Sequence, residues 1–245
     1  QKIVDLQVLY VEVDSFIYYN SSQVANVNDL KSKIITSLTS YAKSSDLNRF
    51  GGRFKYSKVL NVIDNIDKSI TSNITRVKIR RNLNALINQF AQYELCFGNR
   101  FNVKPEGLNI KSTGFRIQGQ SDTVFITDTP NADKLTGVIS IVKRDETTGT
   151  NIVVVKSAGT VDYVHGEVNL TTINIVSTDK PNNIVEVQAF PDSNDVIGLQ
   201  DLYLEFNIPN STINMVKDTI TSGEQISGVG YKVTSSYANG DLTRT

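Results

Sequence analysis

Side chains able to carry out chemistry are few in this sequence. The chain contains one histidine, His165, and one cysteine, Cys96. A Ser-His-Asp triad would have to use this single histidine, and a cluster of histidine metal ligands is impossible. His165 lies in a Val-Asp-Tyr-Val-His-Gly segment that predicts a hairpin turn, and neither residue has the local sequence of a known thiol enzyme. We interpret His165 as a turn residue and Cys96 as a structural residue; a catalytic base and a Cys-His pair are the alternatives.

Two pairs of carboxylates are spaced closely enough to act together. Asp64 and Asp67 are predicted on one face of a helix, and Asp192 and Asp195 lie in a loop begun by a proline, which could hold a hard cation such as calcium. Neither pair has the spacing of a known calcium loop, so solvation of the helix and capping of the turn are favoured. A glycosidase pair stays open, because its carboxylates can come from any part of a chain, although the absence of tryptophan disfavours a sugar platform.

Sequence signatures for phosphate and dinucleotide binding are absent. The chain has no Gly-x-x-x-x-Gly-Lys-Ser/Thr segment, and Gly228 and Gly230 lack the third glycine of a dinucleotide fingerprint. The 25 basic and 25 acidic residues balance, so no overall field favours nucleic acid or an acidic membrane. No apolar run is long enough to span a bilayer. We expect no enzyme activity, no cofactor, no metal, and no nucleic-acid or membrane partner.

A basic strand is the clearest candidate surface. Arg76, Lys78 and Arg80 alternate with apolar residues, which places the three cations on one face of a strand. Arg53 and Lys55 lie just upstream in the sequence. A protein interface, a solvated strand face and a nucleic-acid site are the possible interpretations, and poor aromatic interleaving disfavours the last. We predict an intersubunit contact, and we expect that removing the three strand charges weakens assembly and leaves the fold intact.

The N-terminal elements that position these residues have an α+β pattern. Residues 2–19 form a long extended segment with apolar side chains on both faces, as expected of a central strand that is covered on both sides. Asn28 is predicted to cap a first helix, and Ser57 to cap a second whose apolar residues recur from Val59 to Ile66. Together with the basic strand, these elements predict a sheet that helices cover on one face. Residues 82–97 fit either a helix or a strand.

From about Phe101 the pattern changes to short Val, Ile and Thr runs separated by turn residues, which predicts a β-rich domain. Gly166 is expected to occupy the left-handed position of a hairpin. Ile213 to Ile220 suggest a turn of helix, and the glycine-rich remainder suggests an irregular arm. We therefore predict an α+β protein with two domains: residues 1–100 contain the helix-covered sheet, and residues 101–245 contain the β-rich domain and the arm.

The run from Phe50 to Arg81 joins a glycine-hinged entry, an amphipathic helix and the basic strand. It resembles the C-terminal part of baseplate wedge proteins of contractile-tailed, T-even-like phages, which are related to the baseplate J-like family. Gly159 to Leu170 and the closing TSSYANGDLTRT add weaker similarity. The family's upstream regions are absent and the chain begins with Gln1, so we expect a fragment of a longer polypeptide. The residues that carry the resemblance are Phe54, Tyr56, Ser57, Lys58, Val59, Leu60, Ile63, Asp64, Ile66, Asp67 and Ile70.

This resemblance implies a structural subunit that is not an enzyme. Proteins of this kind pair as dimers, which join with other wedge proteins into a ring around the baseplate hub. The implied location is the virion, in the tail baseplate, after assembly in the host cytoplasm. An alternative from another class is a carbohydrate-binding or glycan-hydrolysing β-domain of a phage tail or surface protein. Turnover of a polysaccharide would favour the alternative, and a concentration-dependent mass would favour assembly.

Overall fold

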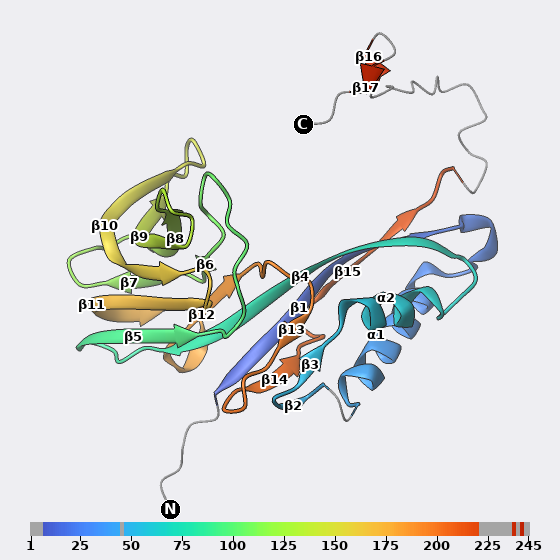
Figure 1. Ribbon diagram of the computed structural model, residues 1–245, viewed down its shortest axis with the longest axis horizontal. Coiled ribbons are helices and arrows are strands. Elements are labelled where there is room, and N and C mark those ends of the chain that lie inside the picture. Colours follow the sequence, from blue (N-terminus) through green and yellow to red (C-terminus); the bar gives the residue numbers. More distant parts are fainter. Residues whose placement is uncertain (1–6, 45–46, 221–236, 239–240, 243–245) are drawn as a thin grey trace, which may run out of the picture.

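A computed structural model describes residues 7–44, 47–220, 237–238 and 241–242 of the chain. The described chain is mostly β and builds two large sheets, which lie at opposite sides of Figure 1. The helices are α1 (Val27–Ala42), α2 (Tyr56–Asp64) and the short 3-10 helices η1 (Ser21–Gln23) and η2 (Pro181–Asn183). The strands are β1 (Val8–Tyr19), β2 (Arg49–Phe50), β3 (Arg53–Phe54), β4 (Ile70–Asn84), β5 (Phe90–Cys96), β6 (Lys111–Ser112), β7 (Phe115–Ile117), β8 (Phe125–Pro130), β9 (Thr136–Arg144), β10 (Asn151–Asp162), β11 (Glu167–Thr178), β12 (Ile184–Ala189), β13 (Val196–Ile197), β14 (Tyr203–Phe206), β15 (Thr212–Lys217), β16 (Tyr237–Ala238) and β17 (Asp241–Leu242).

The seven-stranded sheet is organised around β1. Its strand order is β2-β14-β1-β4-β12-β6, and β15 also pairs with β1. β1 runs antiparallel to β4, with a register that extends from the pair Tyr10 and Arg80 to the pair Tyr19 and Ile70. The other edge of β1 pairs in parallel with β14 and then with β15. The predicted central strand is therefore confirmed over residues 8–19, and residues 2–6 of that prediction lie outside the described residues.

The six-stranded sheet has the order β5-β11-β10-β9-β8, with β7 also paired to β11. β10 and β11 form the expected hairpin, and Gly166 adopts a φ of +69° in its turn. A Cβ atom at Gly166 would come within 2.0 Å of the Asn99 carbonyl oxygen, so a side chain is excluded both by the backbone conformation and by space. The β-rich prediction is thus confirmed, although β10 and β11 are long strands of 12 residues each rather than short runs.

Each of the two large sheets contains strands from both sides of residue 100. β5 belongs to the six-stranded sheet, whereas β6, β12, β14 and β15 belong to the seven-stranded sheet. Residue 100 is therefore not a boundary between the sheets, and the division into domains at that position stays a prediction. Residues 82–97, which left helix and strand open, contain the end of β4 and the whole of β5.

The predicted turn of helix near the C-terminus is wrong. Thr212–Lys217 form β15, which pairs with Asp14 to Tyr19 of β1. Six alternating residues that border a long central strand gain backbone hydrogen bonds from it, and this pairing outweighs a weak helical pattern. The predicted irregular arm lies mainly at residues 221–236, outside the described residues, and so do Gly228 and Gly230.

The helix caps differ from those expected. The side chain of Asn26 accepts the Asn28 N–H at 2.9 Å, so the cap of α1 is Asn26 and Asn28 lies inside the first turn. Ser57 does not cap α2. The Asp195 carboxylate instead accepts the Tyr56 N–H at 2.8 Å, from a loop 139 residues away. A carboxylate at this end also opposes the positive end of the helix dipole.

Apolar faces of both helices are buried. Leu30, Ile34 and Leu38 of α1 are at most 4% exposed, and Val59 and Ile63 of α2 are fully buried. α1 contacts β15 and α2 contacts β4, beside which both helices lie in Figure 1. The helices therefore share a core with a sheet whose strands come from both halves of the chain.

Replacing Ile63 by aspartate tests this packing. Ile63→Asp places a charge where no water reaches, so we expect the free energy of unfolding to fall by at least about 3 kcal/mol. Chemical denaturation followed by circular dichroism measures the change. Asn61→Asp, at an exposed position of the same helix, is the matched control and should shift stability by no more than about 0.5 kcal/mol. Equal stabilities for the two variants would contradict the buried position of Ile63.

Candidate interaction surface

One face of the seven-stranded sheet carries the predicted basic strand. On β1 and β4, residues opposite each other share a face, and the pairs are Tyr10 with Arg80, Glu12 with Lys78, Asp14 with Arg76, and Phe16 with Ile74. We call this set of four pairs the charged face. The intervening residues of β1, such as Val11 and Val13, point to the other side and are fully buried. The predicted shared face of the three cations is confirmed by the register.

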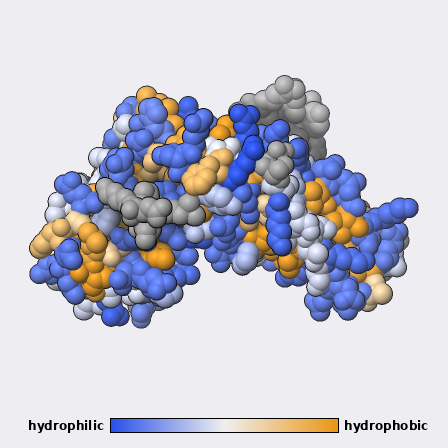
Figure 2. Space-filling view, turned by 90° about the horizontal axis from the view of Figure 1, so that it is seen from below, coloured by the Kyte–Doolittle hydropathy of each residue, from blue (hydrophilic) through white to orange (hydrophobic). Residues whose placement is uncertain are grey.

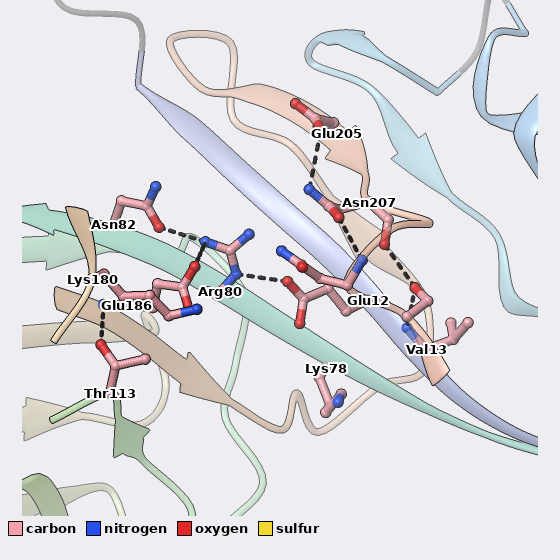
Figure 3. A network of polar contacts seen from close by, with 12 residues as sticks. Glu12, Val13, Lys78, Arg80, Asn82, Thr113, Lys180, Glu186, Glu205 and Asn207 are labelled. Carbon is pink, nitrogen blue, oxygen red and sulfur yellow. Dashed lines mark hydrogen bonds and ion pairs between the residues drawn. The ribbon is translucent and has the colours of Figure 1, made fainter. Parts of the chain in front are cut away.

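Arg80 is buried and fully engaged within the chain. Its Nε donates to Glu12 Oε1 at 2.6 Å, and its Nη1 lies 3.3 Å from Glu186 Oε1 of β12 (Figure 3). Its guanidinium stands over the Tyr10 ring, 4.1 Å from the ring centroid. Arg80 is only 5% exposed, so the expectation of a solvent-facing cation is wrong here. The cause is that β12 continues the sheet beside the end of β4 and brings Glu186 over this position.

Lys78 also has an acidic partner in the chain. Its Nζ lies 2.8 Å from Asp14 Oδ1, and its side chain is 12% exposed. Glu186 receives a second cation, Lys180, at 3.2 Å. Burial raises the pKa of Tyr10, and the nearby carboxylate of Glu205 raises it further. The acidic counterpart that the basic strand requires is thus supplied largely by neighbouring strands.

Arg76 differs from both. Its side chain is exposed, and among the residues that the structure describes it has no ion pair or hydrogen bond. Asp14, which lies directly opposite, is bonded to Lys78 instead. Arg76 is therefore the one cation of the predicted three that remains available to a partner.

Arg53 and Lys55 do not join the charged face. Arg53 belongs to β3, which pairs with β13 in a separate two-stranded sheet, and Lys55 precedes α2. Both side chains are exposed. The five predicted cations therefore belong to different parts of the fold, and only the three from β4 lie together.

The single histidine has a local structural role. His165 Nδ1 lies 2.8 Å from Asp162 Oδ2 in the hairpin turn, and Asp162 Oδ1 accepts the His165 N–H at 2.9 Å. This hydrogen bond raises the pKa of His165 and lowers that of Asp162. Burial raises the pKa of the Cys96 thiol, which opposes formation of a thiolate. These contacts support the interpretation of His165 as a turn residue and of Cys96 as a structural residue.

The carboxylate pairs separate in the structure. Asp195 caps α2, whereas Asp192 lies 3.5 Å from Arg100. Asp64 accepts the Asn73 side-chain amide at 2.6 Å, and Asp67 lies beyond the end of α2, where it accepts the Ser69 N–H. The expected shared helical face of Asp64 and Asp67 is therefore wrong. Among the described residues, no group of three or more His, Cys, Asp or Glu side chains is placed to hold a metal ion.

Sequence reasoning missed the acidic half of the charged face. Glu12 and Asp14 alternate with Val11 and Val13 inside an apolar strand, and this alternation was a usable signal. Glu186 offered no comparable signal, because its contact with Arg80 depends on which strand pairs with the end of β4.

Comparison with known families places this face within a recognisable unit. Residues 7–82 match the family model described as baseplate structural protein gp6, C-terminal domain III. The match covers β1, α1, α2 and most of β4, and residues 83–245 lie outside it. No curated protein matches the chain. The match supports a structural protein of a phage tail baseplate, located in the virion, and suggests a role that is not enzymatic. None of the helices in the described parts of the chain is long and apolar enough to cross a membrane.

Removing the Arg80 charge should destabilise the fold. Arg80→Ser leaves Glu12, which is 4% exposed, without its cation, so we expect the free energy of unfolding to fall by about 3 kcal/mol. The matched variant Arg76→Ser removes an exposed charge and should change stability by no more than about 0.5 kcal/mol. Urea denaturation of both variants measures the difference, and an Arg80→Ser protein as stable as the parent would contradict the engagement of Arg80.

Proposed function

We propose that this chain is a structural subunit of a contractile phage tail baseplate of the T-even-like, baseplate J-like type, and that it acts through protein interfaces. The observation that carries the proposal is the family match over residues 7–82. The matched segment forms the β1–β4 pair and contains both α-helices, of which α2 contacts β4, so the similarity falls on the centre of the seven-stranded sheet. The match does not favour a carbohydrate-binding or glycan-hydrolysing domain.

We further propose that the chain pairs with a second copy, and that the dimers join other wedge proteins in a ring. Large apolar side chains on the surface support this part of the proposal. Phe90 is 69% exposed, Val153 is 56% exposed and Leu86 is 52% exposed, all in or next to the six-stranded sheet. Figure 2 shows hydrophobic residues gathered in separate areas over both ends of the molecule. Where exposed apolar side chains form a contiguous patch, the patch marks a candidate interaction site, and this is the basis on which we place the pairing surface on the six-stranded sheet.

Proteins, rather than nucleic acid or membrane, are the proposed partners. Lys78 and Arg80 neutralise carboxylates within the chain and are not available to phosphate groups. Of the three β4 cations, only Arg76 has no ion pair or hydrogen bond to another described residue, and a single cation gives little of the counterion release that drives nucleic-acid binding. Of the three cations of β4, we propose only Arg76 as an interface residue. Arg53 and Lys55 stay candidates for the interface. Assembly in the host cytoplasm is part of the same proposal.

Self-association of the isolated chain tests the proposed pairing. Sedimentation velocity should show a dimer at about 50 micromolar and a falling average mass on dilution, because a standard interface supports binding in this range or tighter. The double variant Phe90→Ser with Val153→Ser should shift the equilibrium toward monomer if the six-stranded sheet carries the contact. A parent chain that is monomeric at every concentration would contradict pairing through these residues.

A further inference from the structure

Ion pairs on the charged face follow a diagonal pattern. Arg80 lies opposite Tyr10 but bonds to Glu12, one pair further along β1. Lys78 lies opposite Glu12 but bonds to Asp14, again one pair further along. The same step from Arg76, which lies opposite Asp14, reaches residue 16, which is a phenylalanine. The series of ion pairs therefore ends at Arg76. At the position where the pattern would place its carboxylate, the chain has the apolar ring of Phe16.

The patch beyond Arg76 is apolar and open. Phe16 and Ile74 face each other across β1 and β4, and they are 41% and 54% exposed. Most other apolar residues of these two strands are buried in the core, including Leu9, Ile17 and Ile79. Arginine and aromatic side chains, including phenylalanine, are enriched in protein interfaces, and arginine is among the residues that most often dominate their binding energy.

We propose that Phe16, Ile74 and Arg76 form a docking patch for a different protein chain, which presents apolar side chains together with a carboxylate that pairs with Arg76. The inference rests on the proposed function. It adds which kinds of side chain the partner would present to one surface of this chain. The position of the missing acid argues for the carboxylate, because Lys78 holds Asp14 and residue 16 cannot supply a charge. A carboxylate of the partner chain would give Arg76 the kind of ion pair that Arg80 and Lys78 already have within this chain.

A second copy of this chain is a poor occupant of the same patch. Stacking two copies of the patch face to face would bring two unpaired arginines into one interface without an acid between them, and like charges at an interface cost binding energy. The chain therefore binds its own copy elsewhere and keeps this patch for another protein.

Site-specific photocrosslinking in assembled tails tests the proposal. Because Cys96 is the only cysteine of this 245-residue sequence, the variant Ile74→Cys in a Cys96→Ser background can be labelled at one position of the chain with a benzophenone maleimide. The labelled chain is added to an extract of infected cells that cannot make this protein, and the tails are then purified and irradiated. We expect a crosslinked product with a different baseplate protein, at a surface that contains a carboxylate. Leu135→Cys in the same background, labelled at a position that is 49% exposed in the turn between β8 and β9, is the control and should not crosslink to that protein.

The charge is tested in the same experiment. Adding Arg76→Glu should lower the crosslinking yield at least about tenfold, since it replaces an attraction by a repulsion. Lys156→Glu, at an exposed cation of β10, should leave the yield unchanged. Arg76→Glu should not alter self-association in sedimentation, because the patch is separate from the proposed pairing surface on the six-stranded sheet.

Several outcomes would overturn the proposal. A crosslink from residue 74 to a second copy of this chain would do so, as would tails that contain the labelled chain and give no crosslink, or a yield that Arg76→Glu leaves unchanged. If the Ile74-labelled chain alone fails to enter tails while the Leu135-labelled chain enters them, the bulky group has blocked docking, which supports the patch. If neither labelled chain nor the unlabelled parent enters tails, the proposed baseplate function fails, and the docking proposal fails with it.

Discussion

The antiparallel pairing of β1 with β4 is the constraint on which the rest of the structure depends. It fixes which residues of each strand point into the core and which form the charged face. The neighbours of both strands then attach to this pair, with β14 and β15 along β1 and β12 along the end of β4. A shift of the register by one residue would turn Val11 and Val13 toward the charged face and place Glu12 and Asp14 among the apolar residues of the core, so the pattern of apolar and charged residues holds the register in place.

The charged face adds a second constraint on that register. Each of its two internal ion pairs joins a cation to the acid one step along the partner strand, so the pairs form only when the strands are aligned as observed. Buried ion pairs often contribute little net stability, because desolvation offsets the attraction between the charges. Their clearer effect is to make other alignments costly, since a slipped strand would leave Arg80 or Glu12 buried without a partner.

The family match and the strand order together describe how the chain is built. Residues 7–82 supply the central strands and both helices, but β12, β14 and β15, all outside the match, complete the seven-stranded sheet. Glu186 and Asp195 come from this later part and act on the matched part, one beside Arg80 and the other at the start of α2. The matched segment therefore depends on the rest of the chain for both its edges and two of its charged contacts.

The sequence by itself determined the features that depend on periodicity or on one local backbone conformation. These are the central strand β1, the strand β4 with three cations on one face, and the turn at Gly166, because a period of two and a left-handed glycine can be recognised without knowing any distant partner. Only the tertiary structure decided that Arg80 is buried, that Asp195 caps α2, and that Thr212–Lys217 form a strand. Glu12 lies 68 residues from Arg80 and Asp195 lies 139 residues from Tyr56, and contacts over such separations follow from strand order, which local patterns do not encode.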